Sequence, residues 1–195
     1  MKKTILGIAA LALLLGACGG DTSNQFANEA YGAVTIDGTL LPPFDSASTD
    51  GALGQPSPSV SGVNSAGEAV AFTPGSAPTL LVFVAHWCPH CQAEVPRIVE
   101  WLEGNPDRLG VDVVAIATGS QRGQPNFPPA AWLDREGWDQ PLIMDDEDST
   151  AARAFGLTSY PFWVAVDSSG AVVGRVAGEL GADQIGRLFE NLSQT

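Results

Sequence analysis

The sequence contains almost no lysine. Lys2 and Lys3 are the only lysines among its 195 residues, and the other basic residues are seven arginines. Because 22 residues are acidic, seven arginines leave the chain after Lys3 with a formal charge of −15. So acidic a protein repels the phosphate backbone of nucleic acids, and no basic stretch along the chain offsets this repulsion. We therefore expect no nucleic-acid partner.

The sequence also lacks a hydrophobic run long enough to cross a bilayer at its start. The run from Ile5 to Leu15 has about 11 residues, whereas a membrane-spanning helix needs roughly 20. A short apolar run preceded by two lysines is typical of a signal peptide, which we assign to residues 1–17.

Cys18 follows this run directly. Leu15-Gly16-Ala17-Cys18 resembles the bacterial lipobox, in which the cysteine becomes the lipidated first residue of the mature chain. We expect an extracytoplasmic protein attached to the cell membrane by a lipid on Cys18. The alternative is ordinary cleavage near Ala17, which leaves Cys18 as an unpaired thiol.

The length suits one folded domain with appendages. Residues 18–57 are rich in glycine, serine, threonine, aspartate and proline, with only scattered apolar residues. This composition is typical of a flexible linker. We therefore place the lipidated cysteine and a linker in residues 18–57 and the folded domain in residues 58–195.

Hydrophobic patterning predicts an α/β domain with a mixed central sheet and helices on both faces. Thr79–Ala85 is a continuous apolar run, as expected of a strand buried on both faces. Ser149 is the expected N-cap of a short helix, and residues 145–148 before it are expected to form a solvated acidic loop. The predicted strands are 60–63, 69–72, 79–85, 111–117, 141–144, 162–166 and 172–176, and the predicted helices are 89–103, 128–136, 149–155 and 182–192.

Two cysteines lie where the buried strand gives way to the first helix. One helical turn places Cys88 and Cys91 on the same side, close enough for a disulfide. At the helix start, unpaired N–H groups and the positive end of the helix dipole favour a Cys88 thiolate, the form that attacks a disulfide. Cys91, one turn further on, would resolve the mixed disulfide.

Other interpretations of this pair are weaker. A structural zinc site needs four ligands, and the chain has no second Cys-x-x-Cys and only two histidines, His86 and His90. A purely structural disulfide is disfavoured because so short a loop removes little entropy from the unfolded chain. No metal site and no cofactor are predicted.

The segment Trp87-Cys88-Pro89-His90-Cys91-Gln92-Ala93-Glu94-Val95-Pro96 resembles the active-site signature of the thioredoxin superfamily. Its Glu-x-Pro extension resembles the membrane-tethered branch with TlpA, ResA and the cytochrome c maturation thioredoxins. The likeness runs from about residue 58 to the end. It implies a thioredoxin-like fold, thiol-disulfide oxidoreductase activity, and protein thiols or disulfides as partners, either in cytochrome c maturation or in exported cysteine-containing proteins.

The resemblance also assigns roles to single residues. It implies that Glu94 exchanges a proton with the Cys91 sulfur as a partly buried carboxylate of raised pKa. Pro161 is expected to follow a cis peptide bond and to expose the Tyr160 backbone to a substrate strand, and Trp87 to pack beside the cysteines.

His90 is expected to donate a hydrogen bond or a charge to the Cys88 sulfur, which favours the reduced form. The Pro-His pair between the cysteines is also found in the oxidising DsbA proteins. The reduction potential of the Cys88–Cys91 couple is therefore predicted to be more oxidising than that of thioredoxin, which is roughly −270 mV. The TlpA-like flank instead belongs to a branch with many reductants, so the direction of electron flow stays open.

Two functions of other classes remain alternatives. Cys88, Cys91 and a histidine offer soft ligands to Cu(I), as in a copper-handling thioredoxin-like metallochaperone, although the wider cysteine spacing of Sco-like proteins is absent. A binding module with incidental thiols is the other. A peroxidase is disfavoured, because a peroxidatic cysteine is normally set in a different loop.

Overall fold

The computed structural model describes residues 30–195, so the predicted signal peptide and Cys18 lie outside the described residues. The strands are β1 (Thr35–Asp37), β2 (Ser59–Val63), β3 (Ala69–Phe72), β4 (Thr79–Val84), β5 (Asp112–Ala117), β6 (Leu142–Met144), β7 (Phe162–Val166) and β8 (Val172–Ala177). The helices are α2 (Pro89–Gly104), α3 (Pro129–Arg135), α4 (Thr150–Ala154) and α5 (Ala182–Leu192), with a 3₁₀ turn η1 (Arg108–Gly110). No helix within residues 30–195 is both long and apolar enough to span a membrane.

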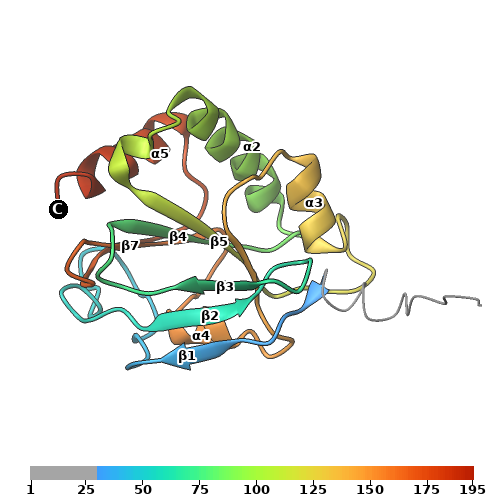
Figure 1. Cartoon of the computed structure of the whole chain (residues 1–195), viewed down its shortest axis with the longest axis horizontal. Helices are drawn as coiled ribbons and strands as arrows, with labels where there is room; N and C mark the ends of the chain where they lie inside the picture. The colour runs from blue at the N-terminus through green and yellow to red at the C-terminus, as the bar shows by residue number, and fades with distance from the viewer. Residues whose placement is uncertain (1–29) are drawn as a thin grey trace, which may run out of the picture.

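A five-stranded mixed sheet forms the centre of the molecule (Figure 1). Its strand order is β6-β5-β4-β7-β8; β4, β5 and β6 are parallel, and β7 and β8 are antiparallel to their neighbours. The parallel pairs are joined through α2 and α3, because a parallel connection needs a crossover. A smaller antiparallel sheet, β1-β2-β3, lies below the central sheet in Figure 1.

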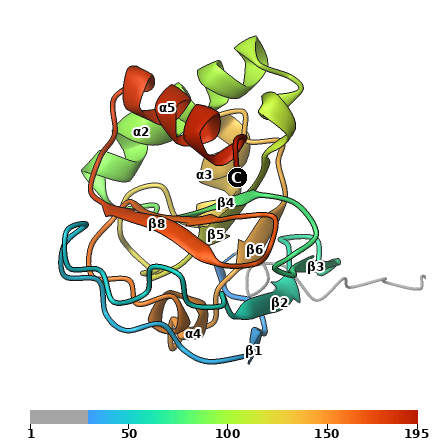
Figure 2. The ribbon, with the colours of Figure 1, turned by 90° about the vertical axis from the view of Figure 1, so that its left-hand side faces the viewer.

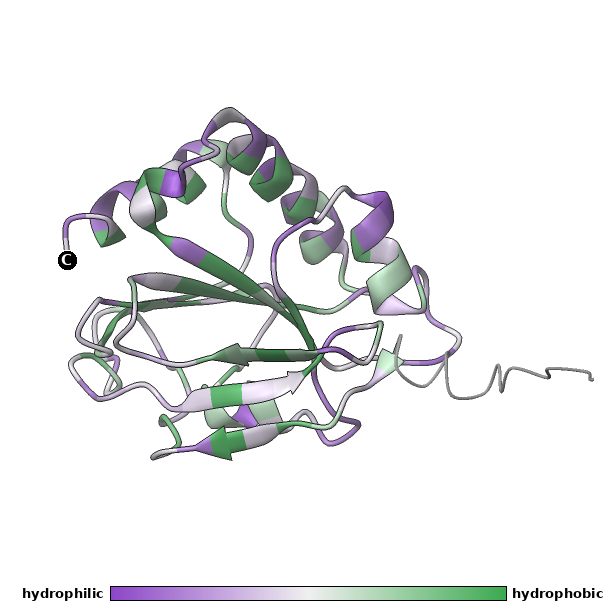
Figure 3. Ribbon diagram, viewed as in Figure 1, coloured by the Kyte–Doolittle hydropathy of each residue, from purple (hydrophilic) through white to green (hydrophobic). Residues whose placement is uncertain are grey.

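The period-two alternation of strands separates two cores, one on each face of the central sheet. On β4, Leu80, Val82 and Val84 face one core, whereas Leu81 and Phe83 face the other. All six residues of β4 are buried, which confirms the prediction of a strand covered on both faces. Figure 3 shows this apolar character along the central strands and on the sheet-facing side of α2.

Helices cover both faces of the sheet (Figure 2). Buried residues of α2, α3 and α5 belong to the first core, and α4 belongs to the second together with Val60 and Phe72 of the small sheet. This arrangement confirms the predicted fold class, and each predicted helix and strand of residues 58–195 is present within one or two residues of its expected bounds.

The start of α4 differs from expectation. Ser149 has a left-handed backbone (φ 55°) and makes no side-chain cap. Instead, the Asp145 carboxylate accepts hydrogen bonds from the N–H groups of Ala151 (2.9 Å) and Ala152 (3.1 Å), and Asp146 accepts one from Thr150 (2.8 Å). The predicted Ser149 cap is therefore wrong, as is a solvated position for Asp145, because this carboxylate is buried to satisfy the helix N–H groups.

The prediction of a flexible linker is wrong for residues 30–57. Within this segment β1 pairs with β2, and the side chains of Leu41 and Ala52 are buried in the second core. Asp50 forms a buried ion pair with Arg175 of β8, and this hydrogen-bonded guanidinium holds the pKa of Asp50 below its ordinary value. Composition suggested a linker because the apolar residues of this segment are sparse. Those residues and Asp50 are nevertheless ordered by contacts with residues far away in the sequence, which composition does not reveal.

Candidate functional site: a dithiol at the start of helix α2

Cys88 lies at the N-terminus of α2. It is the N-cap residue, with an extended backbone (φ −74°, ψ 119°), and Pro89 begins the helix, where its missing N–H is not needed. Its own N–H donates to the Ala85 carbonyl (3.0 Å), which fixes the turn between β4 and α2. The cap position places Cys88 beside the unpaired N–H groups of the first helical turn.

Cys91 lies one turn into α2, and both cysteines are free thiols whose side chains interact. The Cys91 side chain is fully buried, whereas Cys88 retains 6% exposure. The Cys91 sulfur accepts a hydrogen bond from the Ala85 N–H (3.4 Å). Burial raises the pKa of the Cys91 thiol far above its ordinary value, and the nearby Glu94 contributes to the rise. Cys91 therefore needs a base before it can act as a nucleophile.

The peptide bond between Tyr160 and Pro161 is cis, as predicted. This loop precedes β7, the antiparallel neighbour of β4, so pairing of the two strands brings residue 160 to the cysteines. The Tyr160 carbonyl oxygen lies 3.8 Å from the Cys88 sulfur. One backbone carbonyl thus faces the more exposed of the two sulfurs.

Glu94 is completely buried beneath the cysteines. Its Oε1 accepts hydrogen bonds from the Trp163 indole N–H (3.0 Å) and from the Leu180 backbone N–H (3.1 Å), while Oε2 has no partner. Burial raises the pKa of Glu94 to about 7, although both hydrogen bonds oppose the rise. At neutral pH this carboxyl is poised both to accept and to release a proton.

His90 does not contact the Cys88 sulfur. Its Nδ1 lies 2.7 Å from Oε2 of Glu179, in the loop between β8 and α5, and Arg97 of α2 donates to Oε1 of the same carboxylate (2.6 Å). The hydrogen bonds from His90 and Arg97 hold the pKa of Glu179 below its ordinary value. The predicted hydrogen bond from His90 to Cys88 is therefore replaced by a contact with the Glu179 carboxylate on the surface.

Trp87 packs beside the site, as expected. Its ring meets that of Tyr160 edge-on at 5.7 Å, and its indole N–H donates to the Gly119 carbonyl (2.7 Å). A Cβ on Gly119 would lie 2.4 Å from the Tyr160 hydroxyl, so this residue cannot carry a side chain without displacing the ring. The Tyr160 ring is thus held against Trp87 and the chain that follows β5.

Sequence reasoning did not find Arg97, Glu179 or the contacts of His86. Arg97 and Glu179 are 82 residues apart, and only the adjacent placement of α2 and the β8–α5 loop joins them. For His86 a signal was present, because it is one of two histidines and lies two residues before Cys88.

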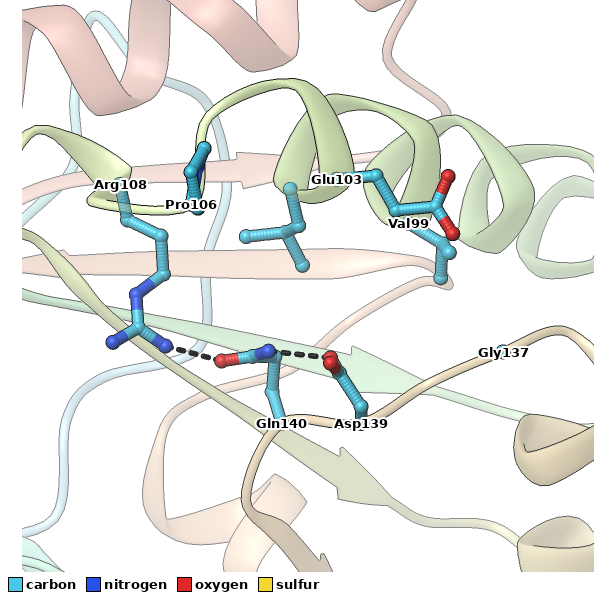
Figure 4. A pocket seen from close by; sticks show the side chains of 8 residues that line it. Val99, Glu103, Pro106, Arg108, Gly137, Asp139 and Gln140 are labelled. Atoms are coloured by element: carbon cyan, nitrogen blue, oxygen red, sulfur yellow. Dashed lines mark hydrogen bonds between the residues drawn. The ribbon is translucent and has the colours of Figure 1, made fainter.

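Other polar groupings lie apart from the cysteines. A hollow near the C-terminal end of α2 is lined by Val99, Glu103 and Arg108, and there Arg108 donates to Gln140 (Figure 4). It lies at the opposite end of α2 from Cys88. In residues 30–195, no three histidine, cysteine or acidic side chains come together in a way that could hold a metal ion.

The sequence profile of the AhpC/TSA family matches residues 53–175, more than half of the chain. The chain belongs to the AhpC/TSA family. The match spans both cysteines, Glu94 and Pro161, whereas Glu179 and Leu180 lie just beyond it.

Solved structures are similar to this AhpC/TSA-family chain over most of their own length. A thiol:disulfide interchange protein of the thioredoxin family from Chlorobium tepidum is 28% identical, with a TM-score of 0.58 over 71% of this chain and 95% of the other. MTB dsbF is 27% identical, with a TM-score of 0.52 over 63% and 88%. A secreted Mycobacterium tuberculosis disulfide oxidoreductase, 22% identical with a TM-score of 0.51 over 63% and 90%, shares the fold.

Proposed function

We propose that the protein is a thiol-disulfide oxidoreductase that exchanges disulfides with protein partners through Cys88 and Cys91. The observation that carries this proposal is the placement of two free thiols one turn apart at the start of α2, with the Tyr160 carbonyl facing the outer sulfur and the Glu94 carboxyl buried below. The thiol:disulfide interchange protein from Chlorobium tepidum supports the same chemistry.

In the direction that reduces a partner, the Cys88 thiolate attacks one sulfur of the partner's disulfide and forms a mixed disulfide. The partner's other sulfur leaves as a thiolate. Cys91 then gives its proton to the Glu94 carboxylate and attacks the Cys88 sulfur. The bond between Cys88 and the partner breaks and the second partner sulfur also leaves as a thiolate. The two partner thiolates take up one proton from Glu94 and one from water, and Cys88 and Cys91 are joined, so two electrons have passed to the partner. Oxidation of a partner dithiol is the same sequence reversed.

Each side chain of the site has a distinct part in this scheme. Cys88 is the exchanging nucleophile because it keeps some exposure, and Cys91 is the resolving thiol because it is buried. Glu94 is the proton acceptor for Cys91. Pro161 sets the Tyr160 carbonyl beside the cysteines, where an extended partner segment would lie, and Trp87 shields the sulfurs from water.

The test compares disulfide reduction in insulin by the wild type and by Cys88→Ser and Cys91→Ser variants. We expect Cys88→Ser to abolish turnover and Cys91→Ser to accumulate a covalent adduct with the substrate, seen as a reducible band on a gel. Glu100→Gln, an exposed change on the same helix, is the matched control and should turn over normally. Full activity of Cys88→Ser would refute the proposed function.

We also propose that the protein works outside the cytoplasm, attached to the membrane through a lipid on Cys18. The leader of residues 1–17 and the lipobox-like Leu15-Gly16-Ala17-Cys18 support this location, and one structurally similar protein is secreted. Labelling with a radioactive fatty acid in bacteria expressing the full chain should mark the wild type and not Cys18→Ala. Equal labelling of both would reject the lipid on Cys18, and absence of label from both would reject the anchor.

A further inference from the structure

The imidazole of His86 is fully buried immediately after β4 and is held at both nitrogens. Nδ1 lies 2.7 Å from the Pro125 carbonyl oxygen, and Nε2 accepts a hydrogen bond from the Gln121 N–H (3.0 Å). Because a carbonyl only accepts, Nδ1 carries the proton and the ring is neutral. Burial also lowers the pKa of His86, which favours this neutral form.

Both partners of the ring belong to one exposed loop, Gly119–Phe127, which we call the 119–127 loop. Further contacts attach it to the same place. Asn126 donates to the His86 backbone carbonyl (3.4 Å), and the Phe127 ring meets the imidazole edge-on at 5.7 Å. His86 thus contacts the second half of the loop and Gln121, whereas its start is held by Trp87 and by Tyr31, whose hydroxyl donates to the Ser120 carbonyl (2.9 Å).

The start of the 119–127 loop reaches the cysteines. Gly119 accepts the Trp87 indole hydrogen bond and lies so near the Tyr160 hydroxyl that a Cβ on it would clash, while the Tyr160 carbonyl faces the Cys88 sulfur. Its middle, residues 121–125, is exposed and offers peptide groups, two glutamine amides and the cation of Arg122. Because the start of the loop reaches Trp87 and Tyr160 beside Cys88, these exposed groups are available to an extended polypeptide that presents a sulfur to Cys88.

We propose that His86 is a positioning residue, whose neutral ring holds the 119–127 loop beside the surface on which an extended polypeptide meets Cys88. This inference rests on the proposed function. It assigns the loop to polypeptide capture and not to the exchange of sulfur bonds, which takes place at Cys88 and Cys91.

Protonation of His86 would free the 119–127 loop from the ring. With protons on both nitrogens, Nε2 becomes a donor that faces the Gln121 N–H, so the hydrogen bond between them is lost. The charged side chains that contact the residues packed against the ring are Arg122, over the Phe127 ring at 5.6 Å, and Arg135 of α3, bonded to Asn126. The titratable groups that follow it in sequence, at the start of α2, are Cys88, His90 and Cys91. The positive charges of both arginines oppose a further positive charge on the His86 imidazole.

Two substitutions at His86 distinguish the effects of the ring's shape, its hydrogen bonds and its protonation. His86→Phe fills the same space and has no hydrogen bonds, so the Gln121 amide should exchange with solvent faster at every pH. His86→Gln supplies a carbonyl acceptor that does not titrate, so its Gln121 protection should not depend on pH. In the wild type, exchange at Gln121, corrected for the intrinsic pH effect, should accelerate as the pH falls from 8 to 4. His90→Phe, the control at the other histidine, should leave Gln121 protection as in the wild type.

The functional readout compares two activities of the full chain, the reduction of insulin and the reduction of oxidised glutathione. For His86→Phe we expect KM for insulin to rise at least fivefold, with a smaller factor lost in the rate with oxidised glutathione, and His86→Gln should restore the ratio. Equal losses with both substrates, or wild-type Gln121 exchange in His86→Phe, would overturn the inference. If His86→Phe does not fold, the pH dependence of the wild type against His86→Gln decides, and matching profiles count against it. Failure of the wild type to reduce either disulfide would instead reject the proposed function.

Discussion

Replacing Glu94 with glutamine should remove a pH dependence of stability that this carboxyl imposes. The pKa of Glu94 is about 7 in the folded protein against an ordinary 4.5, so the folded state holds this proton more tightly than the unfolded state does. Ionisation therefore opposes folding. Its contribution to the free energy of unfolding declines as the pH rises from about 4.5 to about 7, and above that range the loss is about 3 kcal/mol.

Glutamine keeps a carbonyl oxygen for the hydrogen bonds from Trp163 and Leu180 but does not ionise. Between pH 4.5 and pH 8, the stability of Glu94→Gln relative to the wild type should therefore rise by about 3 kcal/mol. The assay is urea unfolding of both reduced proteins at the two pH values, so that other titrating groups cancel. Glu100→Gln should follow the wild-type profile. Parallel profiles for the wild type and Glu94→Gln would refute a raised pKa at this site.

Glu94→Gln should also slow the step in which Cys91 attacks the mixed disulfide at Cys88. Because the pKa of the Cys91 thiol is far above its ordinary value, loss of the nearby proton acceptor should slow the Cys91 step by roughly 10²-fold, as for other general bases. In the wild type that step should accelerate as the pH rises through about 7, and in Glu94→Gln this rise should be absent. A stopped-flow measurement on a preformed mixed disulfide isolates the step, and equal rates would exclude Glu94 from it.

Further outcomes test other parts of the structure. Asp50→Asn leaves the buried Arg175 unpaired and should lower the free energy of unfolding by about 3–5 kcal/mol in urea titrations, whereas an unchanged midpoint would mean that residues 30–57 do not pack as described. Gly156→Ala should lower it by more than about 1 kcal/mol in the same assay, because φ is +72° and the new Cβ would lie 2.2 Å from the Pro42 carbonyl; a neutral effect would contradict that contact. His90→Ala leaves Arg97 as the one side chain that contacts the Glu179 carboxylate and should make the Cys88–Cys91 couple more reducing, so a potential from glutathione equilibration that moves the other way would contradict the pairing.

Much of the fold was predictable because local pattern and tertiary environment agree. The uninterrupted apolar run of β4 reflects burial on both faces, and the three- and four-residue spacing of Val95, Ile98, Val99 and Leu102 reflects one face of α2 on the sheet. The segment before β2 lacks such regularity. Its few apolar side chains are buried only because distant strands and Arg175 supply their contacts, so its composition alone indicated a linker.

The candidate site divides in the same way. The sequence by itself determined the dithiol, since two cysteines one turn apart at a strand-to-helix junction follow from local spacing, and it indicated Glu94 and Pro161 through resemblance. Only the tertiary structure decided which partners these groups have. His90 pairs with Glu179 instead of a sulfur, Glu94 is completely buried, and His86 fixes a loop 35 to 39 residues away in sequence. Hydrogen bonds and burial depend on distances in space, which chain spacing specifies only within a turn or two of the same element.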